Sequence, residues 1–147
     1  MKIEKRQVKD KPLTVIVEYP EWNRHVEGLI GRIGRLDASL AGRTEDRQVS
    51  VALSDIYYIE NVERKLFLYT KDEVYRYEGS MADVGENAGD TGLVRISRTC
   101  FMNTDHLKEI RQLKNSRLEA VMDNDEKLIV SRKYLQDIKK CFGRKAL

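Results

Sequence analysis

Six basic residues fall into three groups that are well separated along the sequence: Arg64 with Lys65, Arg95 with Arg98, and Arg132 with Lys133. An arginine can donate two parallel hydrogen bonds to the edge of a guanine base, and arginine and lysine both neutralise phosphate. Taken singly, each residue is typical of a solvated charge. Together they share a position in a predicted loop or at the end of a predicted element, from which a side chain can extend away from a rigid sheet. This placement indicates a phosphate-bearing partner.

The residues best suited to nucleophilic catalysis are Cys100 and His106, which lie close together in the sequence. Cys100, however, is followed by Phe101 and Met102, and free cysteine is among the residue types that are most often buried. The carboxylates within 123–126 fall in a predicted turn, where aspartate is favoured for its backbone conformation. We therefore expect no catalytic residue and no enzymatic activity.

The sequence also lacks the usual metal and phosphate-loop motifs. Its two cysteines, Cys100 and Cys141, and its two histidines, His25 and His106, are not spaced as zinc ligands. The Gly-rich segment 85–92 is not followed by the Lys-Ser or Lys-Thr pair of a phosphate-binding loop. We expect no metal, no cofactor and no small-molecule substrate.

Charge is distributed unevenly along the 147 residues, although the net charge is only +3. Residues 49–126 contain 10 basic and 15 acidic side chains, whereas residues 127–147 contain 7 basic and 1 acidic. The basic C-terminal stretch is either a solvated face or an electrostatic footprint for phosphate. The acidic middle favours a protein partner instead, so both kinds of partner stay open at this point.

Localisation in the cytoplasm is the expectation from the apolar content. No apolar run approaches the ~18 residues that a membrane span needs. The N-terminus is basic, but its apolar part is short and contains Glu18. A secretory signal peptide is therefore not expected.

The first 47 residues are predicted to form a strand and a helix. The β-branched run at 13–19 is typical of a strand, which Pro20 ends. A helix of about twenty residues is then predicted, with Gly42 as its C-terminal stop. Its apolar residues are spaced 4, 3, 4, 3 and 4 apart: Trp22, Val26, Leu29, Ile33, Leu36 and Leu40. This stripe either packs against the strand or forms a dimer interface.

The charged segment 43–48 is interpreted as a linker, which divides the chain into residues 1–47 and 48–147. After it the pattern changes to short β-like runs with few helical turns. Strands are predicted at 49–53, 56–60, 65–70 and 73–77, a short helix at 79–88, extended or turn-like segments at 93–97 and 100–103, and a hairpin at 117–122 and 127–130. A terminal helix is predicted from Ser131, as its N-cap, to Gly143.

Several consecutive motifs resemble the LytTR family of bacterial DNA-binding domains, over about residues 48–142. The segments that carry the resemblance are IYYIENVERKLFLYT, VRISRTCFMNTDHLKEI and RLEAVMDNDEKLIVSRKYLQDIKK, with a short helix between the first two. The resemblance implies a mainly β fold with added α, an elongated antiparallel domain of three small sheets, here preceded by the strand–helix segment. It also implies that loops of the domain enter successive major grooves, usually as a dimer on paired half-sites.

The resemblance also implies roles for individual residues, motif by motif. The loop after the YIE strand implies DNA contacts at Arg64 and Lys65, the R-I-x-R segment at Arg95 and Arg98, and the S-R pair at Arg132 and Lys133. Asn103 matches a position that closes a turn. Thr99 and Cys100 stand where the family often has Ser followed by Tyr or Phe, which affects the expected local packing.

We therefore expect a bacterial transcriptional regulator that binds specific double-stranded DNA through the loops of a LytTR domain, as a homodimer. The alternative is a non-catalytic protein–protein interaction module on the same fold. Many proteins of this family carry a phospho-receiver domain, for which the preceding 47 residues are too few, so phosphorylation control is not expected. Residues 1–47 are expected to dimerise the protein or to dock a membrane-protein signalling partner.

Overall fold

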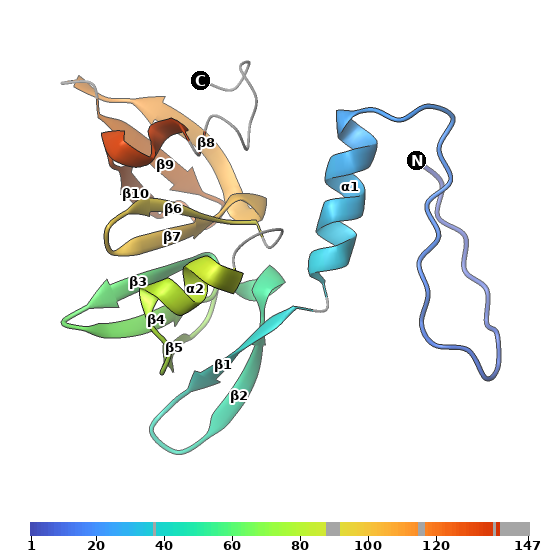
Figure 1. Ribbon diagram of the computed structural model, residues 1–147, viewed down its shortest axis with the longest axis horizontal. Coiled ribbons are helices and arrows are strands. Elements are labelled where there is room, and N and C mark those ends of the chain that lie inside the picture. The colour runs from blue at the N-terminus through green and yellow to red at the C-terminus, as the bar shows by residue number, and fades with distance from the viewer. Residues whose placement is uncertain (37, 88–91, 115–116, 137, 139–147) are drawn as a thin grey trace.

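The computed structural model describes the chain except for residues 37, 88–91, 115–116, 137 and 139–147. Antiparallel strands in two sheets dominate the described residues, together with two α-helices and short 3-10 turns. Figure 1 shows the two sheets one above the other, with the N-terminal helix on one side of both. The predicted mainly β fold with added α is confirmed, with two sheets among the described strands instead of three.

The larger sheet has seven strands in the order β2-β1-β5-β4-β3-β7-β6. Its strands are β1 (Ser39–Arg43), β2 (Gln48–Ala52), β3 (Tyr58–Val62), β4 (Lys65–Tyr69), β5 (Val74–Tyr77), β6 (Leu93–Ser97) and β7 (Cys100–Asn103). Helix α2 (Met81–Asn87) connects β5 to β6 and covers one face of this sheet (Figure 1). The smaller sheet has the order β10-β9-β8, from β8 (Leu107–Gln112), β9 (Leu118–Met122) and β10 (Lys127–Val130).

Alternation along the strands produces two separate cores. In β4 the side chains of Leu66 and Leu68 are buried on one face, while Phe67 and Tyr69 lie on the other. The first core joins that buried face to Val84 of α2. The second core lies between the two sheets and contains, among others, Ile96, Met102, Met122 and Ile138. The smaller sheet is therefore attached to the larger one through apolar packing on β6 and β7.

Asn103 fixes the end of β7 against the connection between β2 and β3. Its buried side-chain amide donates hydrogen bonds to the carbonyls of Leu53, at 3.0 Å, and Ile56, at 2.8 Å. Its Oδ1 accepts from the backbone N–H of Asp105 at 3.0 Å. The turn-closing role expected for Asn103 is confirmed, and an apolar replacement would leave these buried polar groups without partners.

Helix α1 (Arg24–Arg35) is shorter than the sequence indicates. It begins as expected for a capped helix, since the Asn23 side chain accepts from the N–H of Val26 at 3.0 Å. Contrary to prediction, residues 13–19 are extended but form no strand, and residues 39–43 are not helical but form β1. The prediction of a longer helix is wrong at its C-terminal end, because the pairing of β1 with β2 and β5 overrides the local helical spacing of the apolar residues.

Gly42 explains part of this error. It was predicted to end the helix, but it lies buried in the middle of a sheet. A Cβ at this position would lie 2.7 Å from Cγ2 of Val51 and 2.8 Å from Cβ of Tyr75. Glycine is therefore needed for close packing against the neighbouring strands, and not to stop a helix.

The predicted linker at 43–48 is a hairpin turn that joins β1 to β2. The N–H of Thr44 donates to the carbonyl of Arg47 at 3.0 Å, and Arg43 pairs with Gln48 across the turn. This hairpin crosses the proposed boundary between residues 1–47 and 48–147. The division into two functional parts stays a prediction, but the seven-stranded sheet includes residues from both sides of it.

Candidate nucleic-acid interface

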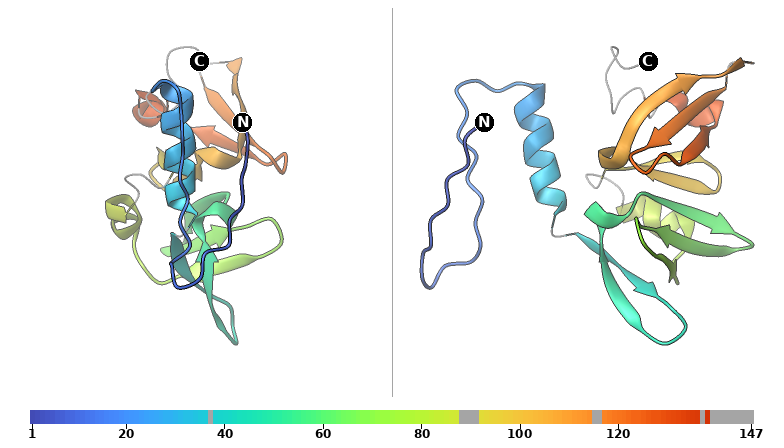
Figure 2. Two further views of the ribbon diagram at one scale, coloured as in Figure 1. Left: turned by 90° about the vertical axis from the view of Figure 1, so that its right-hand side faces the viewer. Right: turned by 180° about the vertical axis from the view of Figure 1, so that it is seen from behind.

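Three connections that carry the predicted basic residues lie along one edge of the molecule. They are the β3–β4 turn, the β6–β7 turn and the 3-10 turn η4 (Arg132–Tyr134) after β10. In Figure 1 they follow one another along the left-hand edge, on the side away from α1, and the rear view in Figure 2 shows the same arrangement. We call this surface the loop edge.

The β3–β4 turn presents Arg64 in an unusual backbone conformation. Glu63 and Arg64 both have positive φ, 53° and 68°. Such a two-residue turn matches the twist of the flanking strands, but Asn and Gly are the residues that usually occupy it. A left-handed conformation costs an ordinary residue about 1–2 kcal/mol. Arg64 is exposed, as is Lys65 at the start of β4, so the turn projects two adjacent basic side chains.

The β6–β7 turn contains Arg98 and Thr99, and both side chains are exposed. The N–H of Thr99 donates to Oγ of Ser97 at 3.2 Å, which holds the turn from inside. This turn is linked to its neighbours by the backbone. The N–H of Asn61 in β3 donates to the carbonyl of Thr99, and the N–H of Ser131 donates to that of Ile96, each at 2.7 Å. The three connections are therefore held in one framework.

Arg95 lies in a different environment from the other predicted contact residues. Its Nε donates to the carbonyl of Ser97 at 3.2 Å, and its Nη2 donates to that of Arg98 at 2.7 Å. The guanidinium also lies 5.6 Å from the ring centroids of Phe101 and of Tyr134. Arg95 thus closes the β6–β7 turn and connects it to η4, an arrangement that the sequence did not indicate.

The η4 turn presents Arg132 and Lys133, both exposed, directly after the smaller sheet. Helical conformation begins here as predicted, but the turn is of the 3-10 type, and Ser131 makes no side-chain cap hydrogen bond. The ammonium group of Lys133 lies 5.5 Å from the Tyr134 ring. Gly143, the predicted end of this helix, lies outside the described residues.

Ion pairing distinguishes basic side chains of the loop edge from Arg43 and Arg47 on the β1–β2 hairpin. Arg43 pairs with Glu78, and Arg47 with Glu73 at 3.0 Å. Within the described part of the chain, the side chains of Arg64, Lys65 and Arg98 form no ion pair. Arg43 and Arg47 would have to give up these partners to bind an external anion, whereas Arg64, Lys65 and Arg98 can bind one directly.

Two further exposed basic residues were not singled out from the sequence. Lys114 follows β8 and Arg117 precedes β9, the two strands that are paired at the top of the view in Figure 1. The pattern LKNSRL, with basic residues on both sides of a polar Asn-Ser pair, is the signal that could have identified them.

Cys100 and His106 occupy separate environments. Cys100 is buried in the core between the sheets, where burial and the nearby Glu60 raise the pKa of its thiol to about 12. His106 stacks on Tyr57, with ring centroids 4.1 Å apart, and its Nε2 bonds to the carbonyl of Ser54. A thiol held neutral in this way is a poor nucleophile. Among the described residues no cluster of metal-ligating side chains is found.

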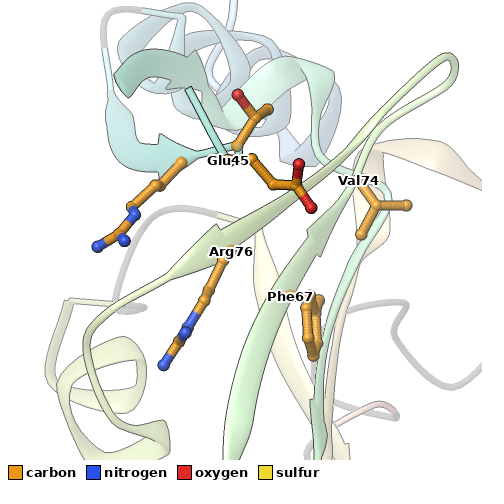
Figure 3. A pocket seen from close by; sticks show the side chains of 6 residues that line it. Glu45, Phe67, Val74 and Arg76 are labelled. Atoms are coloured by element: carbon orange, nitrogen blue, oxygen red, sulfur yellow. The ribbon is translucent and has the colours of Figure 1, made fainter. Parts of the chain in front are cut away.

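A shallow hollow of about 400 Å³ lies elsewhere, beside the β1–β2 hairpin and β5 (Figure 3). Its lining includes the apolar side chains of Phe67 and Val74 and the charged side chains of Arg76 and Glu45. Its polar groups are partly engaged, since Arg43 pairs with Glu78 and the Thr44 hydroxyl donates to Asp46 at 3.0 Å. The lining has no cysteine or histidine, so it offers no activated nucleophile.

None of the described helices has the length and apolar character of a membrane span.

A known domain family accounts for about two-thirds of the chain. The family described as the LytTr DNA-binding domain matches residues 46–143. The chain is 29% identical over 99 residues to the sensory transduction protein LytT of Enterococcus faecalis, covering 67% of this chain and 41% of that protein. It is 28% identical over 92 residues to the protein of the same name from Bacillus subtilis, covering 63% and 38%. The chain thus spans about two-fifths of the length of these relatives.

One solved structure is similar in fold. It is a LytTr DNA-binding domain from Bacillus cereus, which superposes with a TM-score of 0.68 at 22% sequence identity. The similarity covers 73% of this chain and 98% of that domain. Nearly the whole of the known domain therefore has a counterpart here.

Proposed function

Because this chain belongs to the LytTr DNA-binding domain family, as its motifs predicted, we propose that it binds specific double-stranded DNA with its loop edge. In this proposal the protein is a bacterial transcriptional regulator that acts in the cytoplasm as a dimer on paired half-sites. It is a binding protein and not an enzyme. Arg64, Arg98 and Arg132 reach base edges or phosphates from three successive connections.

One observation carries the proposal. Exposed basic side chains from three connections, distant in sequence, lie along one edge of a framework that backbone hydrogen bonds hold together. A double helix presents successive grooves along its length, so a row of projecting turns is a suitable surface for it. Contacts to phosphate would position the protein, and contacts to base edges would select the sequence.

The test is titration of labelled duplex DNA from the region upstream of the protein's own gene, followed by fluorescence anisotropy. Arg98→Ala and Arg132→Ala should each weaken binding by about 1–3 kcal/mol if they contact base edges. Arg76→Ala removes the same charge from an exposed position in β5, beside the hollow of Figure 3, and should bind like the unmodified protein. Circular dichroism should be the same for all variants. If both loop-edge variants bind normally while folded, the proposed site is wrong.

The dependence of binding on salt provides a second measurement. With about 4–6 phosphate contacts per protomer, the logarithm of the association constant should fall with the logarithm of salt concentration, with a slope of about −0.9 per contact. A slope near zero would contradict a DNA partner.

The alternative is a regulatory module that holds a protein partner on the same fold. The acidic balance of residues 49–126 favours it. Absence of any gel shift, specific or not, at low salt would favour this alternative. For residues 1–47 we propose dimerisation, and docking of a membrane-protein signalling partner is the alternative role.

A further inference from the structure

Exposed apolar side chains are concentrated in the N-terminal quarter of the chain. Thirteen large hydrophobic residues are exposed in the described structure, and ten of these precede residue 37. Scattered single residues of this kind are normal on a protein surface, but a local concentration marks an interaction surface. The remaining three, Val62, Val74 and Ile129, are distributed over the two sheets.

Residues 13–19 have the sequence pattern of a β-strand, but they pair with no strand of the described chain. Leu13, Val15, Val17 and Tyr19 alternate with Thr14, Ile16 and Glu18, so a strand here would have one fully apolar face. The segment is extended, and no backbone hydrogen bond joins it to the rest of the described chain. Unpaired N–H and C=O groups in an extended segment are a ready template for pairing with another strand.

The segment is complementary to itself. If two copies pair antiparallel about a two-fold axis through Ile16, Ile16 lies opposite Ile16, and Val15 lies opposite Val17. Pro12 and Pro20 bound the run on both sides, and proline cannot donate to a ladder, so they oppose extension or slippage of the register. Any slip by one residue would place the apolar face of one strand beside the polar face of the other.

The surface available is adequate for a dimer. At about 100 Å² for a fully exposed aliphatic side chain, the exposed apolar residues from Leu13 to Leu36 can supply on the order of 450 Å² per copy. This is close to the apolar share of a standard interface, which buries roughly 800 Å² per partner and is a little over half apolar. An isolated two-stranded ribbon is only marginally stable in water, so its apolar face must pack against another element. Trp22, in edge contact with Tyr19 at 5.5 Å, and the exposed Ile30 and Leu36 at α1 provide apolar groups for this.

We propose that residues 13–19 pair antiparallel with the same residues of a second copy, with Ile16 on the two-fold axis, and that α1 covers the resulting ribbon. This inference rests on the dimer of the proposed function and names the segment that makes it. The N-terminal segment and α1 lie on the side of the molecule opposite the loop edge (Figures 1 and 2), so the pairing leaves the DNA-facing surface accessible.

The test uses the full chain without DNA, with mass measured by sedimentation and light scattering over a range of concentrations. The unmodified protein should be a dimer. Ile16→Lys and Ile16→Glu should each raise the dissociation constant several-fold, because each places two like charges opposite one another on the two-fold axis in place of two isoleucines. An equimolar mixture of the two variants should recover the dimer. Val74→Lys, at an apolar site that is also half exposed, should leave the mass unchanged.

A monomer at every concentration, an Ile16→Lys dissociation constant equal to that of the unmodified protein, or a mixture that associates no more tightly than either variant alone would overturn the inference. Because Ile16 is 81% exposed in the single chain, neither substitution should alter its folding, which thermal unfolding would check. DNA binding is measured separately. If the chain binds DNA specifically but does not dimerise through Ile16, only this inference is wrong. If the chain dimerises as expected but does not bind DNA, only the proposed function is wrong.

Discussion

At the scale of single residues, Arg64 and Arg95, which were both predicted to contact DNA, have different structural roles. Arg64 projects from a turn whose backbone conformation favours glycine or asparagine. Arg95 is half-buried, and its guanidinium is bound to two carbonyl groups of the β6–β7 turn. We infer that Arg64 acts on the partner directly, whereas Arg95 positions Arg98 and η4.

Replacing Arg64 with glycine should separate stability from binding. Arg64→Gly relieves a left-handed arginine at φ 68°, so the free energy of unfolding should rise by up to about 1 kcal/mol or stay constant. DNA affinity should fall at least several-fold because the guanidinium is lost. Urea unfolding and anisotropy titration measure the two effects. A destabilised variant with normal affinity would show that Arg64 serves the turn and not the partner.

Arg95 and Arg98 should differ in the salt dependence of binding. Arg98→Gln removes an exposed charge and should reduce the magnitude of the slope of log affinity against log salt by about 0.9 if Arg98 contacts phosphate. Arg95→Gln should lower affinity through a loosened turn while the slope stays the same. Titrations at several salt concentrations distinguish these outcomes, and an equal loss of slope in both variants would mean that Arg95 also contacts DNA.

At the scale of elements, the β1–β2 hairpin and its contact with β5 depend on a residue without a side chain. Gly42 faces Val51 on one neighbouring strand and Tyr75 on the other, with no space for a Cβ. Leu40 and Val49 on the same hairpin pack against the first core. The hairpin is therefore part of the sheet, although the sequence suggested a helix end followed by a linker.

Gly42→Ala should destabilise the fold. The added methyl group would lie 2.7 Å from a side-chain carbon of Val51, so strands must move, at a cost of about 1–3 kcal/mol. Urea denaturation at equilibrium measures this loss. Gly34→Ala is a suitable control, since Gly34 is in α1 with open space around its Cβ position, and it should not destabilise. Equal stability of Gly42→Ala and the unmodified chain would contradict the close packing described above.

At the scale of the whole molecule, the interface between the two sheets contains ionisable groups that are held neutral. Burial, aided by Glu126, raises the pKa of the Tyr58 hydroxyl, and burial raises that of the Cys100 thiol to about 12. Tyr69, stacked on Tyr58 with ring centroids 4.3 Å apart, has a pKa raised by burial and by Glu60. The packing of the sheets therefore depends on these groups remaining uncharged.

Stability should fall in alkaline solution. The folded state binds the Cys100 proton more tightly than the unfolded chain, whose thiol titrates near 9.0, so stability is fully present below that pH and is lost as pH rises toward 12. Tyr58 and Tyr69 add a loss of the same sign above pH 10.0. Thermal unfolding at a series of pH values measures the decline, and Cys100→Ala should make it shallower between about pH 9 and 10. A flat profile up to pH 10 would contradict burial of the thiol.

Much of the fold was predictable from local pattern. The alternation in 65–70 identified β4, and the polar segment 123–126 between two apolar runs identified the β9–β10 hairpin. Such patterns depend only on which residues are neighbours in the chain, and a strand that is half buried must alternate. The helical stripe, by contrast, extended too far, because a fitting spacing at Leu36 and Leu40 cannot reveal that Leu40 pairs with Val51.

By itself, the sequence determined the mainly β class, the family, and the chemistry of the basic residues that could meet DNA. Only the tertiary structure decided which of them share an edge and that Arg95 is directed at its own turn. The physical reason is that alternation and turn composition are local. The meeting of the β3–β4 turn, the β6–β7 turn and η4 instead depends on long-range strand pairing and on the shared core between the sheets.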